Sequence, residues 1–252
     1  TRDLARAALD DRAAPASVAA SIAFARRAAA RLRDRLAPEA ARLVAERGAP
    51  AEEREPAVEA VSPRAATLDR AQALLTAFAA IAGLSHENMT RSDGWRLLDM
   101  GRRIERAVAT CRFAEALAGD DATGADLDVL LDLVDCQITY RTRYLIGPAL
   151  APVRDLALLD PSNPRSLAFQ VERLREHVDA LPVLREDGLP EPPQRRARAL
   201  ANVLASAEAE SLEAAAIAGF AQDLLALADA IGARYFPYGA AAERPEKLTG
   251  LS

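Results

Sequence analysis

The chain has 252 residues, of which half are hydrophobic and only 4% aromatic, and its formal net charge is −5. No block of lysine or arginine stands among aromatic residues, so the sequence predicts no nucleic-acid partner. No unbroken run of eighteen apolar residues occurs, so we expect no membrane span. No secretory pattern opens the chain, and we take Cys111 and Cys136 to be reduced thiols of a cytoplasmic protein.

Alanine is abundant, glycine is scarce, and most prolines lie between periodic segments. This composition predicts an all-α fold, a bundle of about seven to nine helices with no β-sheet. We expect one helical domain over residues 1–237, an exposed loop over 48–63 and a flexible tail over 238–252. The predicted helices span residues 16–36, 38–47, 64–84, 95–118, 126–145 and 164–181, with one bent helix or two over 194–236. In the helix over 64–84 the core candidates are Leu68, Leu75, Phe78 and Ile81.

The predicted helix over residues 126–145 carries a charged residue on its apolar face. At about 100° per residue, one stripe collects Leu127, Leu130, Leu131, Val134, Ile138 and Leu145. Arg141 falls on the same stripe. A guanidinium keeps its charge in proteins, and stranding it in a core costs several kcal/mol unless a carboxylate pairs with it. We therefore expect Arg141 to be buried and paired, either as a structural lock or as part of a site.

A carboxylate that could pair with Arg141 lies on the preceding helix. Glu105 borders the apolar stripe there, beside Arg102 and Arg106. Gly101 costs this helix up to about 1 kcal/mol relative to alanine, and we expect the compensation to be close approach of another helix. One interpretation is that Glu105 receives Arg141. The other is a solvated Glu105 whose local partner is Arg102 or Arg106.

Polar side chains are dense around Arg141. They are Asp135, Gln137, Thr139, Tyr140, Thr142, Arg143 and Tyr144. One interpretation is an anion or carboxylate site built from Arg141, Arg143 and a tyrosine hydroxyl. The other is a buried network of salt bridges and hydrogen bonds that fixes the register of the helices.

The segment from Asp160 to Ser166 precedes a predicted helix. Asn163 is a candidate N-cap and Pro164 a candidate first helical residue. Free N–H groups at a helix N-terminus attract anions, and Arg165 adds positive charge. Asn163, Arg165 and Ser166 are therefore a candidate anion site, and the alternative is a helix cap alone.

The sequence lacks motifs for metals and nucleotides. His86 and His177 each adjoin a glutamate directly, a spacing at which two side chains do not share a helix face. No Glu-x-x-His pair, Gly-rich phosphate loop or cysteine cluster occurs, so we expect no metal and no cofactor in this chain. Cys111 or Cys136 could be a nucleophile, although inert buried thiols are commoner.

Three segments together resemble a known family. They are MTRSDGWRLLDMGRRIERA (89–107), LLDLVDCQITYRTRYL (130–145) and DPSNPRSLAFQVERLREHVDALP (160–182). They are similar to the bacterial alpha-E domain family, all-helical proteins named for glutamate-bearing helices, over most of residues 16–237. The positions that match the family's polar motif residues are Arg102, Glu105, Arg106, Tyr140, Arg141, Arg143, Asn163, Arg165 and Ser166. The family usually opens with a further helix that is missing here, so we expect a partner segment, an upstream domain or a longer form of this chain to supply it.

Members of this family are encoded beside, or fused to, ATP-grasp proteins, which implies a role in ATP-dependent amide or peptide chemistry. The first hypothesis is a helical accessory or substrate-recognition domain for an ATP-grasp-type ligase, in trans or fused, with ATP and Mg²⁺ bound by that ligase. The second is that the cluster of arginine, glutamate and tyrosine itself binds or converts a carboxylate or peptide. Glu105 would then be a general base if burial raised its pKa. The third is a purely structural helical module.

Overall fold

The chain folds into helices and turns. The computed structural model describes residues 2–15, 17–32, 35–47, 63–145, 147–185 and 187–236, and these contain eleven α-helices and no strand. The predicted all-α fold class is therefore confirmed, but the helix count exceeds the predicted seven to nine. The described residues form two compact units, and the division falls at Trp95.

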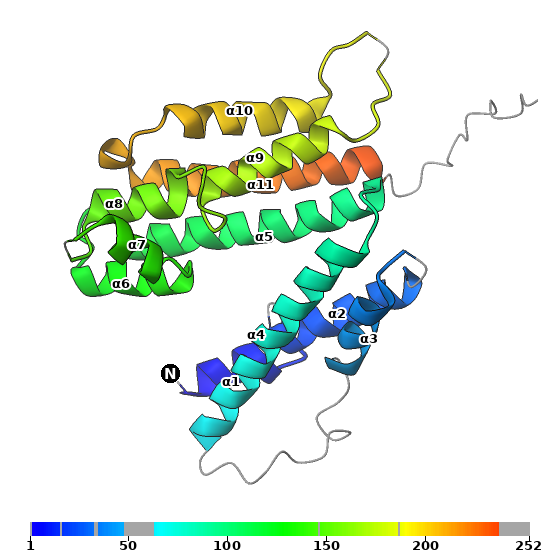
Figure 1. Ribbon diagram of the computed structural model, residues 1–252, viewed down its shortest axis with the longest axis horizontal. Helices are drawn as coiled ribbons and strands as arrows, with labels where there is room; N and C mark the ends of the chain where they lie inside the picture. Colours follow the sequence, from blue (N-terminus) through cyan, green and yellow to red (C-terminus); the bar gives the residue numbers. More distant parts are fainter. Residues whose placement is uncertain are drawn as a thin grey trace, which may run out of the picture. The chain divides into compact units, whose positions relative to one another are not determined.

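Four helices build the first unit: α1 (Arg2–Asp10), α2 (Val18–Arg31), α3 (Pro38–Arg47) and α4 (Pro63–Asn88) (Figure 1). α3 packs against both α2 and α4, and α1 also contacts α2 and α4. Ser17 begins α2, because its Oγ accepts a hydrogen bond from the Ala20 amide at 3.0 Å. Arg70 on α4 pairs with Asp10 at the end of α1, 2.8 Å away. α1 has no counterpart among the predicted helices.

The predicted core face of α4 is wrong. Leu68 and Leu75 are 61% and 63% exposed, whereas Leu74 and Ala77 are buried. Phe78 is also exposed, and Ile81 is half-buried. α4 is rich in alanine and leucine on all sides, so its apolar residues do not single out one face.

The second unit contains seven α-helices and two short turns: α5 (Asp93–Leu117, whose first residues precede the division), α6 (Gly124–Leu133), α7 (Gln137–Arg143), α8 (Leu150–Arg154), a π-helical turn (Asp155–Leu159), α9 (Leu167–Asp179), α10 (Pro192–Ser206), a 3₁₀ turn (Ala209–Ser211) and α11 (Ala214–Tyr235). α10 packs against both α9 and α11 (Figure 1). The core consists mainly of leucines that are fully buried, among them Leu130, Leu131, Leu156, Leu158, Leu167, Leu174, Leu224 and Leu227. Burial of each such side chain stabilises the fold by about 1.5–3 kcal/mol.

The single helix predicted over residues 126–145 is broken. α6 ends at Leu133 and α7 begins at Gln137, and between them Asp135 has a φ of 54°. A left-handed residue interrupts the α-helical hydrogen bonds and redirects the chain. The apolar stripe therefore holds only as far as Val134, and beyond the break Ile138 is 83% exposed.

α11 is the most apolar of the long helices in the part of the chain that the structure describes. By length and composition alone it could cross a membrane, although the sequence holds no unbroken apolar run of that length. Ile217, Leu224 and Leu227 are fully buried, and Phe220 and Ile231 join them on the same face. Packing in the core of the second unit accounts for these five residues, although only 28% of the most apolar stretch of the helix is buried.

Several predictions about chain organisation are not tested. Most of the predicted loop over 48–63, and the whole tail over 238–252, lie outside the described residues. The single domain over 1–237 stays a prediction. The alternative of two helices over 194–236 is confirmed, because α10 and α11 are separated by a 3₁₀ turn.

Candidate functional site

A buried carboxylate on α5 connects two helices of the second unit. Asp99 is 5% exposed, and it accepts hydrogen bonds from Arg102 Nη2 and Arg103 Nε, each at 2.5 Å. Its Oδ2 also lies 2.8 Å from His177 Nε2 on α9. Arg103 Nη1 donates to Gln170 Oε1, also on α9, at 3.1 Å. α5 and α9 are thus joined by a polar network at the edge of an apolar core.

The Asp99 carboxyl strongly favours its ionised form. Burial by itself raises the pKa of this carboxyl, but the hydrogen bonds from His177, Arg102 and Arg103 outweigh burial and lower the pKa well below its usual range. Asp99 therefore stays ionised at neutral pH and is a poor general base. Sequence reasoning missed Asp99, although arginines three and four residues later are a local signal for an ion-paired acid.

The expected burial and pairing of Arg141 are wrong, and so is the interpretation that Glu105 receives it. Both side chains are exposed, and no ion pair joins Arg141 to any residue that the structure describes. The break at Asp135 turns α7 away from the stripe that carried the prediction. Gly101 is exposed, and a Cβ added there would meet nothing within 4 Å, so no helix that the structure describes approaches it closely. The solvated Glu105 is the interpretation that holds, but neither Arg102 nor Arg106 pairs with it.

Arg106 is a half-buried arginine without a carboxylate. It forms neither an ion pair nor a hydrogen bond within the described ranges. Its pKa is lowered, first by burial and then by the positive charges of Arg165, Arg102 and Arg103. The Arg106 guanidinium therefore lies close enough to Arg165, Arg102 and Arg103 to be repelled by each of them.

Asp135 and Arg165, expected in two separate clusters, lie together. Arg165 Nη2 and Asp135 Oδ2 are 2.9 Å apart, and both side chains are largely exposed, at 44% and 75%. An exposed pair of this kind contributes only about 0–1 kcal/mol to stability. The Arg165 guanidinium is therefore held only weakly and is open to solvent.

Tyr140 and Arg143 have structural partners. Tyr140 is buried, and its hydroxyl donates to the Gly147 carbonyl at 3.1 Å and accepts from the Ala149 amide at 3.0 Å. Arg143 pairs with the buried Asp160. Both contacts fix the segment that follows α7. They agree with the interpretation of this region as a network that holds helices in register.

The predicted cap of the helix after Pro164 is shifted by three residues. Ser166, rather than Asn163, is the N-cap of α9, and its Oγ accepts from the Phe169 amide at 3.0 Å. Asn163 is buried and donates through Nδ2 to the Leu156 carbonyl at 2.7 Å. Of the three predicted residues of this anion site, only Arg165 extends a side chain to solvent.

Among the described residues the buried arginine is Arg154, which sequence reasoning missed. Its side chain is 2% exposed, and Nε donates to the Ala118 carbonyl at 2.9 Å. Nη2 donates to Asp120 Oδ1, also at 2.9 Å. Arg154 therefore satisfies a carbonyl just past the end of α5. α8 has only five residues, too short for a periodic pattern to reveal it.

Both cysteines are buried free thiols, as the sequence predicted. Burial raises the pKa of Cys111 to about 12, and it also raises the pKa of Cys136. A thiol must ionise to act as a nucleophile, so neither is suited to that role at neutral pH. Within the described ranges, no group of three or more His, Cys, Asp or Glu side chains could hold a metal ion.

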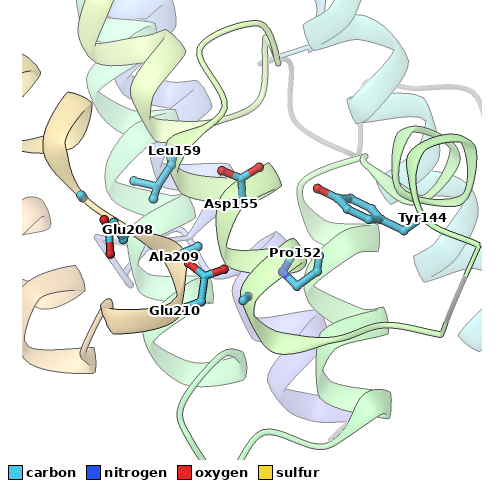
Figure 2. A pocket seen from close by; sticks show the side chains of 9 residues that line it. Tyr144, Pro152, Asp155, Leu159, Glu208, Ala209 and Glu210 are labelled. Carbon is cyan, nitrogen blue, oxygen red and sulfur yellow. The ribbon is translucent and has the colours of Figure 1, made fainter.

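An open pocket of about 400 Å³ lies between the π-helical turn and the segment that follows α10. Figure 2 shows Tyr144 on one side and Glu208 and Glu210 on the other, with Asp155 between them. The remaining lining is mostly apolar and includes Pro152, Leu159 and several alanines. The volume lies in the usual range for sites that bind small molecules.

The pocket is electronegative. Burial raises the pKa of Asp155, and the negative charges of Asp160 and Glu210 raise it further. Burial likewise raises the pKa of Tyr144, with Asp155 as a second cause. Arg143 opposes these effects only in part, because Asp160 pairs with it. A cation placed here would relieve the repulsion among the carboxylates.

The π-helical turn positions Asp155 in the pocket. The Asp160 amide donates to the Asp155 carbonyl at 2.9 Å, a bond that spans five residues instead of four. Turns of this kind are rare and occur frequently at functional sites. Sequence reasoning missed the pocket, because neither the π-helical turn nor the 3₁₀ turn has a periodic signature.

The fold and these sites define an all-helical protein whose polar side chains either hold helices together or line an acidic pocket. The model of Alpha-E, a predicted alpha-helical domain with a conserved ER motif, matches residues 1–236, and the chain belongs to this family. Glu105 and Arg106 form one of the Glu-Arg pairs in the sequence. The resemblance inferred from the three segments is thus confirmed.

The curated relatives are much longer than the region they share with this chain. Uncharacterized proteins of Mycobacterium bovis and of two strains of Mycobacterium tuberculosis are each 34% identical over 122 residues. The match covers 46% of this chain and 14% of each relative. No solved structure matches the chain.

Proposed function

We propose that this chain is a substrate-recognition domain that holds an amine-bearing substrate for an ATP-dependent amide or peptide ligase of the ATP-grasp type. The pocket beside the π-helical turn carries the proposal. Asp155, Glu208 and Glu210 offer carboxylates to an ammonium group, and Pro152 and Leu159 offer apolar surface to its aliphatic stem. No basic side chain lines the pocket among the described residues, so an anion would be repelled.

The buried titratable groups outside the pocket do not fit catalysis. Asp99 stays ionised because its pKa is lowered, and the cysteines stay protonated because their pKa values are raised. General acid–base catalysis is most efficient when the pKa of the group lies near the working pH. We therefore place bond formation, with ATP and Mg²⁺, in the partner ligase. The partner itself is inferred from the family resemblance.

A role inside a larger assembly also fits the size of the relatives. The matching segment makes up 14% of each, so it is one part of a much longer chain. An amide ligase must bring an amine and an activated carboxyl group together, and alignment of the two accelerates the reaction. A helical domain that holds the amine would contribute this alignment.

The pocket is tested by calorimetric titration with cadaverine, a diamine, and with glutarate, a dicarboxylate of similar length. We expect cadaverine to bind and glutarate not to bind. Asp155→Asn should weaken cadaverine binding by about tenfold or more, since a hydrogen bond to a charged group contributes about 1.5–3 kcal/mol. Asp223→Asn, an exposed position on α11, makes the same change in charge away from the pocket and should bind as the native chain does. Equal binding by both variants would contradict the proposal.

The partner is tested separately by measuring amide formation by a purified ATP-grasp-type ligase with and without the chain. We expect the chain to lower the KM for the amine substrate, and Asp155→Asn to abolish this effect. Ligase turnover that is unaffected by the chain would leave the third hypothesis, a structural module. Amide formation by the chain alone, with ATP, would favour the enzyme hypothesis instead.

A further inference from the structure

A second charged region of the second unit has the opposite sign from the pocket. Asp99, Arg102, Arg103 and Arg106 follow one another at helical spacing on one side of α5. The hydrogen bond from Arg103 to Gln170 and the proximity of Asp99 to His177 set α5 antiparallel to α9. Continuing this register by one turn places Arg106 opposite the beginning of α9, where Arg165 lies.

The carboxylates of this region are already engaged. Asp99 accepts hydrogen bonds from Arg102 and Arg103 and also lies next to His177. Asp135 receives Arg165. The two carboxylates thus pair with Arg102, Arg103 and Arg165. The fourth arginine of the region, Arg106, pairs with neither of them. Glu105 is adjacent in sequence, but its exposed carboxylate pairs with none of the arginines among the described residues.

We propose that Arg106, together with Arg102 and Arg165, binds an oxyanion. A guanidinium presents a planar array of N–H donors that fits the two oxygens of a carboxylate or phosphate group. Arg106 has all its donors free for a ligand within the described part of the chain, and Arg165 is held only by an exposed carboxylate. A dianionic group would match the excess of two positive charges in this cluster. This site does not rest on the proposed function of the pocket.

The lowered pKa of Arg106 supports this assignment. Burial and the neighbouring arginines disfavour the charged form of Arg106, so the folded chain carries an electrostatic repulsion at this point. A bound anion would relieve this repulsion. Removal of the guanidinium would relieve it as well, and no carboxylate would be left unpaired. Arg106→Gln should therefore fold as well as the native chain.

The experiment titrates the full chain, at low and constant ionic strength, with inorganic phosphate and separately with glutarate, by calorimetry. We expect at least one of them to bind, and Arg106→Gln to weaken that binding by about tenfold or more. The matched control is Arg112→Gln, an exposed arginine on the same helix without a partner in the described residues. It makes the same change in charge and should bind as the native chain does. Preference for phosphate or for glutarate identifies the ligand as a phosphate or a carboxylate.

A second variant tests the opposite direction. Asp135→Asn removes the carboxylate that competes for Arg165, so anion binding should become tighter, and more so than in Asp223→Asn. Thermal melting without added anion should place Arg106→Gln at or above the native melting temperature, which separates loss of binding from loss of folding. If neither phosphate nor glutarate binds to the native chain, the proposal is overturned. Equal binding by the Arg106 and Arg112 variants would overturn it too.

Discussion

Asp99 Oδ2 and His177 Nε2 lie 2.8 Å apart, although 78 positions separate the two residues in the chain. Asp99 also receives Arg102 and the largely buried Arg103, so it balances the charge at the contact between α5 and α9. Asp99→Asn would leave Arg103 without a carboxylate. Breaking a buried pair by removal of one partner costs about 3–5 kcal/mol, and we expect a loss of this order in the free energy of unfolding. Urea unfolding at neutral pH measures it, with Asp223→Asn as the control that should stay within about 0.5 kcal/mol.

The contribution of Asp99 should depend on pH in a defined direction. Its folded pKa lies below the unfolded value of about 3.9, so the carboxylate network stabilises the folded state fully above that value. The stabilisation is lost as the pH falls below about 4 towards the folded pKa. The difference in unfolding free energy between the native chain and Asp99→Asn should therefore be constant from about pH 7 to 5 and shrink at lower pH. A difference that grows on acidification would contradict this account.

Substitutions of two arginines, the buried Arg154 and the exposed Arg141, test which guanidinium stabilises the fold. Arg154→Met retains most of the side-chain volume but leaves the Ala118 carbonyl without its donor. An unsatisfied buried group costs about 1–3 kcal/mol. Arg141→Met removes an exposed guanidinium without a partner in the described part of the chain, so its effect should stay within about 0.5 kcal/mol. Thermal or urea unfolding of the two variants compares them directly. A larger loss of stability for Arg141→Met than for Arg154→Met would support the prediction that Arg141 is buried and paired.

The break between α6 and α7 is tested at Asp135, whose φ is 54°. Asp and Asn tolerate the left-handed region better than other residues with a Cβ, for which it costs about 1–2 kcal/mol. Asp135→Ala should therefore destabilise the chain by about 1–2 kcal/mol. Asp135→Asn keeps the backbone preference and removes only the exposed pair with Arg165, so it should cost at most about 1 kcal/mol. Equal losses would mean that the ion pair, and not the backbone, is the cause.

The thiols should be unreactive in the folded chain. Burial raises the pKa of Cys111 to about 12 and also raises the pKa of Cys136, so little thiolate forms at pH 8. We expect an excess of iodoacetamide to label neither cysteine in the native protein and to label both in denaturant. Asn163 Nδ2 donates a hydrogen bond to Cys136 Sγ at 3.1 Å. Rapid labelling of Cys136 without denaturant would indicate that this hydrogen bond opens in solution. Mass spectrometry of the peptides distinguishes the two sites.

Much of the fold follows from local patterns. The helix that begins at Pro38 is predicted to the residue, because a proline at the first position marks its start. The core leucines of α6 are also predicted, because the periodicity holds over that helix. It fails at Asp135, since hydrophobic periodicity does not register a single left-handed residue. The periodicity therefore predicts Arg141 on an apolar stripe that in fact ends at Val134, before Arg141 is reached.

The sites were harder to predict because their partners are far apart in the sequence. Arg102 and Arg106 could be selected from the chain, and both belong to the arginine cluster that the structure defines. The placement of Arg165 beside them depends on the packing of α9 on α5. The acidic pocket depends on two short turns that no periodic pattern reveals, so the sequence does not predict a site at Asp155, Glu208 and Glu210.

The π-helical turn makes the pocket sensitive to a change of one residue in chain length. A hydrogen bond that spans five residues accommodates one more residue per turn than the α-helix does. Deletion of one residue between Arg154 and Asp160 would allow continuous α-helix, and the residues within the turn would shift by about 100° around the helix axis while those beyond it keep their register. The helices could then keep much of their packing while a carboxylate turned away from the pocket. During divergence of the family, a single codon could therefore change the ligand and leave the scaffold in place.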